Sequence, residues 1–392
     1  MNSNSPLVSV IVAAYNAEIF IKQTLDSVLN QTYRNIEVLV VDDGSEDRTA
    51  EIVAAIVQKS QRVLLLQQSN KGVASARNLA IQNSRGAYIA PIDADDIWYP
   101  QKLEKQMQCM LQAEPSVGLV YAWSAYIDEK ELFIGRYRAD NFYTVEGDVY
   151  MTQVYRNFIG NASTPLIRRA CLDKIGGYSC QLKEQDAQGC EDWDLYLRIA
   201  EYYQFRVVPE FLVGYRQSTG SMSSNFASMA RSYHLVIANV QQKHPEIPSF
   251  IYQWSGSFFY NYLLGKSYEC RDYGSTLVYI YIYRALQLDL ALLLRLGLYK
   301  MFIKSLLKVA FKPVTSIWQA RYPWLKLRQL SKGNNKVITF SEINEQVNHK
   351  HQFSWKPYDI ILSQRWSCAV KMNSQSQELS NESFLDSKVT NY

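Results

Sequence analysis

The chain has 392 residues, of which 47% are hydrophobic and 20% are charged, so it is long enough for two domains or for one large domain with an appendage. This composition is unlike that of a disordered chain, and a net charge of only +4 excludes a protein whose main role is to coat nucleic acid. The six cysteines are scattered without a CxxC pair, which is typical of reduced thiols. The amino terminus shows neither the basic nor the apolar part of a secretory signal, so we expect a cytoplasmic protein.

Residues 7–91 alternate between short apolar runs rich in β-branched residues and segments whose apolar residues recur at helical spacing. The apolar runs predict buried strands, and the segments between them predict helices. Strands that alternate with helices predict an α/β fold, with a mostly parallel sheet and helices on both of its faces. The expected strands are 7–14, 36–41, 62–67 and 87–91, and the expected helices are 17–31, 49–60 and 74–84.

The pattern changes twice farther along the chain. Aromatic-rich strands at 117–126 and 205–215, with a helix at 192–203, predict the second half of the same domain. Beyond it the strand pattern disappears, and helical periodicity gives way to a polar tail that we expect to be largely disordered. The resulting boundaries are 1–225 for the α/β domain, 226–330 for an α-helical carboxyl-terminal region and 331–392 for the tail.

Polar residues follow several of the expected strands, at the edge where parallel sheets bind ligands. Asp93, Asp95 and Asp96 crowd three carboxylates into four residues, which a divalent cation or the donors of a ligand would stabilise. These residues could equally form a turn or cap the next helix, so both interpretations stay open for this motif alone. Two interpretations also stay open for Asp42, in the run Asp42-Asp43-Gly44-Ser45: it could belong to a turn, or it could contact a base or ribose.

Five motifs occur together in one order. They are Val8-Ser-Val-Ile-Val-Ala-Ala-Tyr-Asn16, Val40-Val-Asp-Asp-Gly-Ser45, Gly72-Val-Ala-Ser-Ala-Arg-Asn78, Asp93-Ala-Asp-Asp96 and Glu191-Asp-Trp-Asp-Leu195. In this order and spacing the sequence closely resembles the family 2 glycosyltransferases, over about residues 6–225. The resemblance implies the GT-A fold, a Rossmann-like and mostly parallel sheet with flanking helices, here followed by the helical carboxyl-terminal region.

The resemblance also implies roles for individual positions. Asp95 would be a direct metal ligand, with Mg²⁺ or Mn²⁺ as the cofactor, and Asp93 would contact ribose or a metal-bound water. Asp192 would be the catalytic base, where the structural alternative is a charge that stabilises the amino terminus of a helix. The implied donor-nucleotide residues are Ala14, Tyr15, Asn16, Asp42, Gly72, Arg77, Asp93 and Ala94, and those implied on the acceptor side are Glu191, Trp193 and Gly177.

One position departs from the family pattern. Many relatives carry a histidine that approaches the metal or the diphosphate, and the matching run here is Tyr215-Arg-Gln-Ser-Thr-Gly-Ser221, with Ser218 in the histidine position. Serine is a poorer ligand, so the departure affects that contact while the aspartate pair and Asp192 are retained. The four histidines of the chain lie away from the motifs, and we assign them no catalytic role.

The resemblance predicts an inverting enzyme that moves a sugar from a nucleotide diphosphate donor, a UDP-sugar in our interpretation, to an acceptor hydroxyl. The acceptor would be a growing glycan or a lipid-linked saccharide in polysaccharide or cell-envelope synthesis. A nucleotide-binding oxidoreductase or a nucleotidyltransferase would instead carry a glycine-rich phosphate loop where this chain has Tyr15-Asn16. A non-catalytic relative that serves as an assembly subunit would agree with Ser218 but not with an intact Asp192.

The expected helix at 290–311 is amphipathic and basic. The window 286–332 around it contains nine Lys or Arg residues and a single acid. Such a helix can lie on an anionic membrane surface, which would put the protein at the inner face of the cytoplasmic membrane, or it can pack on neighbouring helices with its lysines in solvent. Both interpretations stay open. The basic positions are Lys300, Lys304, Lys308 and Lys312, and the apolar positions are Leu296, Tyr299, Phe302, Ile303, Leu306, Leu307 and Ala310.

Overall fold

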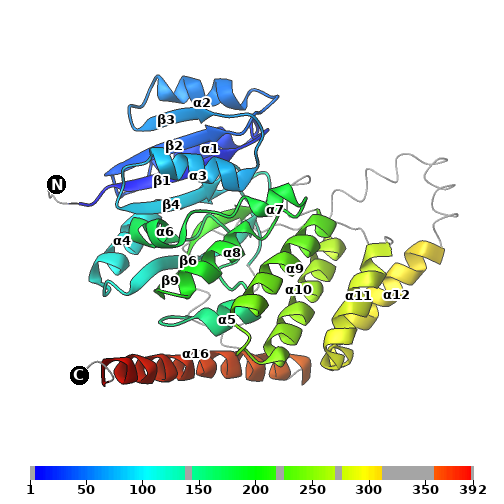
Figure 1. The fold of residues 1–392 in the computed structure, drawn as a ribbon. Coiled ribbons are helices and arrows are strands. Elements are labelled where there is room, and N and C mark those ends of the chain that lie inside the picture. Colours follow the sequence, from blue (N-terminus) through cyan, green and yellow to red (C-terminus); the bar gives the residue numbers. More distant parts are fainter. Residues whose placement is uncertain (1–4, 137–143, 218–224, 270–275, 311–356, 390–392) are drawn as a thin grey trace, which may run out of the picture.

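The structure is a computed structural model of the chain, and it describes residues 5–136, 144–217, 225–269, 276–310 and 357–389. The amino-terminal half forms an α/β domain, and a group of helices lies beside it (Figure 1). This arrangement agrees with the α/β fold and the helical carboxyl-terminal region expected from the sequence.

The first half of the sheet is parallel, with the strand order β3-β2-β1-β4. Most side chains of β1, β2 and β4 are buried, which explains why these strands appear in the sequence as continuous apolar runs rather than as alternating ones. The elements are β1 (Val8–Ala14), α1 (Ile21–Leu29), β2 (Ile36–Asp42), α2 (Thr49–Val57), β3 (Val63–Gln67), α3 (Val73–Asn83) and β4 (Tyr88–Asp93).

The second half continues the same sheet in the order β4-β8-β6-β9-β5, so the aromatic-rich strands belong to one domain with the first half, as expected. β6 and β9 are parallel, whereas β8 is antiparallel to both β4 and β6. The elements are β5 (Ile97–Trp98), α4 (Lys102–Gln112), β6 (Val117–Ile127), β7 (Phe133–Arg136), α5 (Tyr150–Tyr155), β8 (Leu166–Arg168), α6 (Arg169–Ile175), α7 (Gln181–Glu184), α8 (Glu191–Ala200) and β9 (Gln204–Arg216).

Helices cover both faces of the sheet and create two cores. Val10 and Val12 of β1 point into the core shared with α1, α2 and α4, whereas Ile11 between them points into the core shared with α3, α6 and α8. This alternation follows from the period of two along a strand. The second core extends without interruption into the carboxyl-terminal helices, so these helices pack on the α/β domain through apolar side chains.

The carboxyl-terminal region consists of α9 (Phe226–Lys243), α10 (Ser249–Glu269), α11 (Thr276–Leu288), a 3₁₀ helix η2 (Leu290–Leu294) and α12 (Leu296–Ala310). Aromatic rings join it to the domain, because Tyr233 of α9 stacks on Phe259 of α10 at 4.2 Å and approaches Trp193 of α8 at 5.5 Å. Figure 1 shows α11 and α12 on the side of these helices away from the sheet.

The tail that we expected to be largely disordered contains a helix, α16 (Pro357–Val389). Trp366 of this helix is buried against Tyr155 and Phe158, with ring centroids 6.2 Å apart in both pairs. Arg365 forms a bidentate ion pair with the buried Asp289, at 2.5 and 2.8 Å. Because the tail is polar overall, its sequence did not indicate these few anchoring residues. They hold the first part of α16 to α5 and η2.

The Arg365–Asp289 pair gives a test of this docking. Replacing Arg365 with Met leaves a buried carboxylate without its partner, and we expect the free energy of unfolding to fall by about 3 kcal/mol. Burial would raise the pKa of Asp289, but Arg365 lowers it below 3.8, so the contribution is present above that pH and is lost in acid. Urea unfolding near neutral pH and near pH 3 measures the effect. The double variant Arg365→Met, Asp289→Asn should recover part of the loss, and no recovery would contradict the assignment.

Candidate active site

The carboxyl ends of three neighbouring strands bring the expected site residues to one edge of the sheet. In the register of the sheet, Ala14 lies opposite Asp42, and Ala13 lies opposite Asp93. Tyr15 follows β1 and is half exposed. The parallel order of the strands therefore collects the motifs of the first, second and fourth strands at one place, as the sequence predicted.

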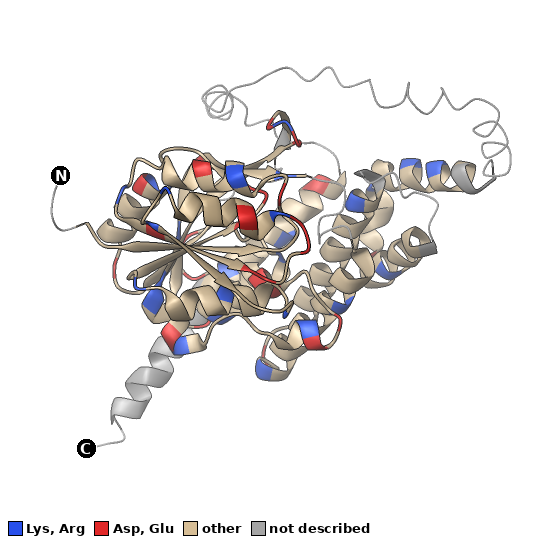
Figure 2. Ribbon diagram, turned by 90° about the horizontal axis from the view of Figure 1, so that it is seen from above, with Lys and Arg blue, Asp and Glu red and all other residues tan. Residues whose placement is uncertain are grey.

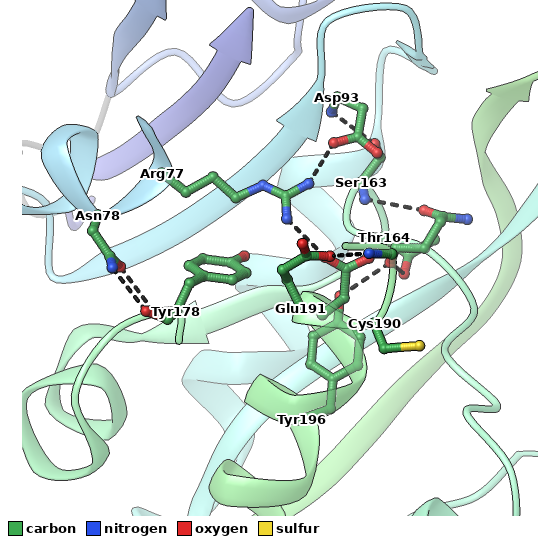
Figure 3. A network of polar contacts seen from close by, with 12 residues as sticks. Arg77, Asn78, Asp93, Ser163, Thr164, Tyr178, Cys190, Glu191 and Tyr196 are labelled. Carbon is green, nitrogen blue, oxygen red and sulfur yellow. Dashed lines mark hydrogen bonds and ion pairs between the residues drawn. The ribbon is translucent and has the colours of Figure 1, made fainter. Parts of the chain in front are cut away.

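Arg77 lies at the centre of this site and forms ion pairs with two carboxylates. Its Nη2 atom is 2.6 Å from Asp93 Oδ1, and its Nη1 atom is 2.7 Å from Asp192 Oδ1. The arginine side chain is 5% exposed, whereas those of Asp93 and Asp192 are 30% and 24% exposed. In Figure 3 the Arg77 side chain extends from its helix toward Asp93, beside the ring of Tyr178. The pairs bring two residues to one guanidinium, although Arg77 and Asp192 are 115 positions apart in the sequence.

Burial and charge oppose each other at these groups. Burial raises the pKa of Asp192 above its ordinary value of 3.8, while Arg77 lowers it and the Asp93 carboxylate raises it again, with a net rise. Burial would lower the pKa of Arg77, but Asp192 and Asp93 raise it well above its ordinary value, so the guanidinium stays charged. A raised pKa is the direction that suits a carboxylate which has to accept a proton.

Asp95 and Asp96 occupy different environments, although they are adjacent. Asp96 is fully buried, and its carboxylate accepts hydrogen bonds from Ser163 Oγ and from the backbone N–H of Arg216. Asp96 therefore fixes the loop, as the turn interpretation of this motif suggested. Burial, and after it the neighbouring Asp93 carboxylate, raises the pKa of Asp95 to about 7. A carboxylate in this position is stabilised by added positive charge.

Arg216 also holds this loop, a role that the sequence analysis did not predict. Its side chain is fully buried, with Nε donating to the Asp95 carbonyl at 2.6 Å and Nη1 donating to the Asp128 carbonyl at 2.9 Å. Its guanidinium also lies 4.4 Å from the centroid of the Phe20 ring. The only sequence signal was its place in the run Tyr215-Arg-Gln-Ser-Thr-Gly-Ser221, and Ser218 of that run lies outside the described residues.

The donor set fits a hard divalent cation that shares its coordination with phosphate oxygens. Among the described residues, no group of three or more His, Cys, Asp or Glu side chains could hold a metal ion by itself. Mg²⁺ and Mn²⁺ are commonly held by one or two carboxylates together with substrate phosphates, so a complete protein cage is not required. Asp95, with its raised pKa, and Asp93 beside it are the residues that fit this role.

The loops after β1 and β2 are locked together by polar contacts. Asn16 has a φ of 49°; its N–H donates to Ser45 Oγ, and its Oδ1 accepts from the N–H of Glu46. Asp42 is buried and accepts hydrogen bonds from the N–H of Ser45 and from Gln67. The buried Ala14 ends β1 beside them. Asn16 thus shapes the loop, Tyr15 is half exposed at its surface, and Asp42 is buried beneath it.

Asp43 connects this region to α3, and sequence reasoning did not separate it from Asp42. Its carboxylate accepts hydrogen bonds from the N–H groups of Lys71 and Gly72 and from Gln68. Gly72 caps α3 with a φ of +88°, and a Cβ there would lie 3.1 Å from atoms of Lys183 and Gln188. The backbone conformation therefore favours glycine here, and a Cβ would also require the Lys183 and Gln188 side chains to shift slightly.

Three other expected residues have structural contacts. Trp193 is buried and donates its indole N–H to the Gln153 carbonyl, so it belongs to the core. Gly177 allows Asn78 to approach, because a Cβ at this glycine would lie 2.2 Å from Asn78 Oδ1. The carbonyl of the buried Ala94 accepts from Thr24 Oγ1.

Two buried polar atoms lie close to the Arg77 centre without a hydrogen-bond partner among the described residues. They are Tyr178 Oη and Glu191 Oε1. The Tyr178 ring is 5.0 Å from the Arg77 guanidinium, and the second Glu191 oxygen accepts from the N–H of Gly189. The sequence pointed to Glu191 through its motif, but it gave Tyr178 only as part of a glycine turn.

Comparisons with known proteins identify the family of this chain. A family model described as Glycosyl transferase family 2 matches residues 9–176. An uncharacterized glycosyltransferase of Methanocaldococcus jannaschii is 30% identical over 217 residues, which are 54% of this chain and 71% of that protein. An uncharacterized glycosyltransferase of Rickettsia typhi is 32% identical over 203 residues, which are 52% of this chain and 62% of that protein. The chain therefore belongs to glycosyl transferase family 2.

The matches to some relatives cover only part of each chain. An uncharacterized glycosyltransferase of Haemophilus influenzae is 46% identical over 110 residues, which are 28% of this chain and 44% of that protein. The chain thus spans less than two thirds of the length of the Rickettsia and Haemophilus relatives.

Two solved structures are among those that the chain matches. S. aureus TarS has a TM-score of 0.46 at 19% identity, over 66% of this chain and 43% of TarS. The mannosyltransferase PcManGT from Pyrobaculum calidifontis, in complex with GDP-Man and Mn²⁺, has a TM-score of 0.45 at 18% identity, over 79% of this chain and 88% of that protein. The GT-A-like fold of this chain is defined by its own strand order and flanking helices.

The Arg77 pairs predict a pH-dependent stability. Replacing Arg77 with Met leaves two partly buried carboxylates without a counter-ion, so we expect the free energy of unfolding to fall by about 3 kcal/mol near pH 8. Burial still raises the pKa of Asp192 in the Arg77→Met variant, so the native state of the variant binds protons more readily. The deficit in its free energy of unfolding therefore shrinks toward pH 5. Urea unfolding at the two pH values measures this, with Arg77→Lys as the charge-retaining control. A deficit independent of pH would contradict the prediction.

Proposed function

We propose that this chain is an inverting glycosyltransferase that moves a sugar from a nucleotide diphosphate donor, a UDP-sugar in this proposal, to a hydroxyl of a growing glycan or of a lipid-linked saccharide. The observation that supports it most directly is the Arg77 guanidinium, paired with Asp93 at the candidate donor side and with Asp192 at the candidate acceptor side. Membership of glycosyl transferase family 2 supports sugar transfer as the reaction class.

On the donor side, Tyr15 and Asp42 would border the nucleotide base. Uracil carries an N–H that a carboxylate can accept, and Asp42 is already held in place by Ser45 and Gln67. The half-exposed ring of Tyr15 could cover the base. Arg77 would help to hold the nucleotide by exchanging its contact with Asp93 for a phosphate oxygen, since guanidinium groups bind both kinds of anion.

On the acceptor side, Asp192 would act as the general base. Its carboxylate takes the proton of the acceptor hydroxyl while the oxygen attacks the anomeric carbon, and the bond from that carbon to the diphosphate oxygen breaks. Attack from the face opposite the leaving group inverts the configuration and needs no glycosyl-enzyme intermediate. Arg77 would keep the Asp192 carboxylate oriented and ionised until the acceptor binds.

Asp95 and Asp93 would hold the divalent cation. When bound, Mg²⁺ or Mn²⁺ supplies positive charge that offsets the charge of the departing diphosphate. Asp96 and Arg216 would keep the Asp95 backbone in position. The pathway of this proposal is polysaccharide or cell-envelope glycan synthesis in the cytoplasm.

A first experiment identifies the donor. A panel of nucleotide sugars is screened for metal-dependent thermal stabilisation, because a ligand that binds only the folded state raises its apparent stability. Release of nucleotide diphosphate from the stabilising donor then separates an enzyme from a non-catalytic assembly subunit, which would bind without turnover.

Replacing Asp192 with Asn should lower transfer by about 10²–10⁴-fold while donor binding stays almost unchanged, because the lost group acts on the acceptor proton. Turnover and the donor dissociation constant measure the two effects. Asp194→Asn is a matched control, since Asp194 lies in the same helical turn but pairs with Arg198. Wild-type turnover in the Asp192 variant would exclude it as the base.

Replacing Asp95 with Ala should weaken metal-dependent donor binding by at least about 10-fold, a loss seen even for residues that only support a metal ligand. Calorimetric titration with donor, with and without Mn²⁺, measures this change. Asp26→Ala is the control, because Asp26 lies exposed on α1 and pairs with Lys22. Full activity in excess EDTA would show that the reaction needs no metal.

A further inference from the structure

Helix α12 exposes an unusual number of large apolar side chains. Leu296 is 81% exposed and Ile303 is 55% exposed, and Tyr299, Phe302, Leu306 and Leu307 are exposed to between 41% and 50%. We call these six residues the α12 patch. Three leucines of the preceding η2, Leu290, Leu293 and Leu294, extend the apolar surface. Contiguous exposed apolar surface of this kind usually marks a contact with a partner or a membrane.

The patch lies on one side of the helix, and the side that faces the protein is different. At about 100° per residue, the six patch residues fall within an arc of about 140°. Leu298 and Ser305, which are buried, fall on the opposite side together with the half-buried Met301. The six patch side chains are therefore only partly covered by neighbouring helices, with the Phe302 ring 6.1 Å from that of Tyr279 in α11.

Basic side chains border the patch. Lys300 and Lys304 are exposed and fall on one flank of the apolar arc. Figure 2 shows α12, which precedes the long grey trace, with blue residues and no red ones. Residues 290–341 contain ten Lys or Arg and no Asp or Glu. An apolar face flanked by lysines is the pattern of a helix that lies in the interface of an anionic bilayer.

Charge argues against the two other simple occupants of the patch. Residues 311–356 of the same chain contain eight Lys or Arg and two Glu, so this segment would bring like charge to Lys300 and Lys304. A second copy bound through the same patch would also bring its own lysines to the contact. An anionic lipid surface instead offers both negative charge and an apolar interior.

We propose that the α12 patch binds the surface of an anionic membrane, with its six apolar side chains inserted at the headgroup boundary and Lys300 and Lys304 at the phosphates. Tyr299 suits this depth, because tyrosine rings collect at membrane interfaces, and Phe302 is typical of the apolar face of interfacial helices. Within the described residues, no helix is long and apolar enough to span a membrane. This contact goes beyond sugar transfer and does not depend on it.

Co-sedimentation of the full chain tests the contact. The vesicles contain equal parts of phosphatidylglycerol and phosphatidylcholine, or phosphatidylcholine alone, and no donor or acceptor is present. We expect binding to the anionic vesicles only, and weaker binding as salt rises, because the Debye length is about 10 Å at 0.1 M salt and shorter above it. Because no sugar is transferred in this assay, its outcome is independent of the proposed reaction.

Two variants separate charge from apolar insertion. Lys300→Gln with Lys304→Gln should weaken partitioning by about 5-fold for each lysine replaced. Leu296→Ser with Ile303→Ser should abolish binding to the anionic vesicles, and it should leave the fold intact because both side chains are exposed. The matched control is Lys59→Gln with Leu111→Ser. Lys59 is an exposed lysine just after α2, and Leu111 is an exposed leucine on α4.

Selective binding that both α12 variants weaken and the control retains supports the proposal. Absence of sedimentation at low salt would overturn it, as would equal binding to both vesicles. Binding that survives both variants would place the membrane contact elsewhere. Light scattering without vesicles adds a further outcome, because a dimer that Leu296→Ser with Ile303→Ser converts to monomer would show that a second copy covers the patch.

Discussion

The site depends on one buried cation. A guanidinium that is 5% exposed is stable only if its charge is compensated, and Arg77 finds that compensation in Asp93 and Asp192. Asp93 ends β4 in the parallel half of the sheet, whereas Asp192 lies in the first turn of α8, which belongs to the second half of the domain. A buried ion pair is weak evidence for stability, because desolvation offsets its attraction. Its clearer consequence is geometric, since both halves of the domain have to meet at the same guanidinium.

A second buried arginine organises the other two acids of the cluster. Arg216 fixes the backbone carbonyl of Asp95 and donates its own N–H to Asp96, whose carboxylate also binds Ser163. The two arginines therefore act differently: Arg77 pairs with the carboxylates of Asp93 and Asp192, whereas Arg216 binds the backbone carbonyl of Asp95 through Nε and the Asp96 carboxylate through its backbone N–H. Asp96 has a structural role. Burial and Asp93 raise the pKa of Asp95 to about 7, so added positive charge has its largest effect on the Asp95 carboxylate.

Local pattern was enough to predict the parts of the site that depend on parallel strands. Asp42 and Asp93 follow apolar runs, and parallel register brings such positions to one edge. The contact between Arg77 and Asp192 was beyond local pattern, because it depends on side-chain direction across 115 residues. Helical periodicity also predicted which residues lie on each face of α12, but it did not predict what covers those faces. In the tail, low overall hydrophobicity outweighed the signal of Trp366, which is buried by a partner far away in the sequence.

The carboxyl-terminal helices belong to the site through the residue next to Asp192. Trp193 is held by Gln153 through its indole N–H and packs against the rings of Tyr233 and Phe259 in α9 and α10. Adjacent positions at the start of a helix move together, so the packing that fixes Trp193 also restricts Asp192. Helices α9 and α10 therefore support the first turn of α8 through Trp193, while Arg77 restrains the same turn through Asp192. This arrangement explains why an apolar core, rather than a linker, joins the helical region to the α/β domain.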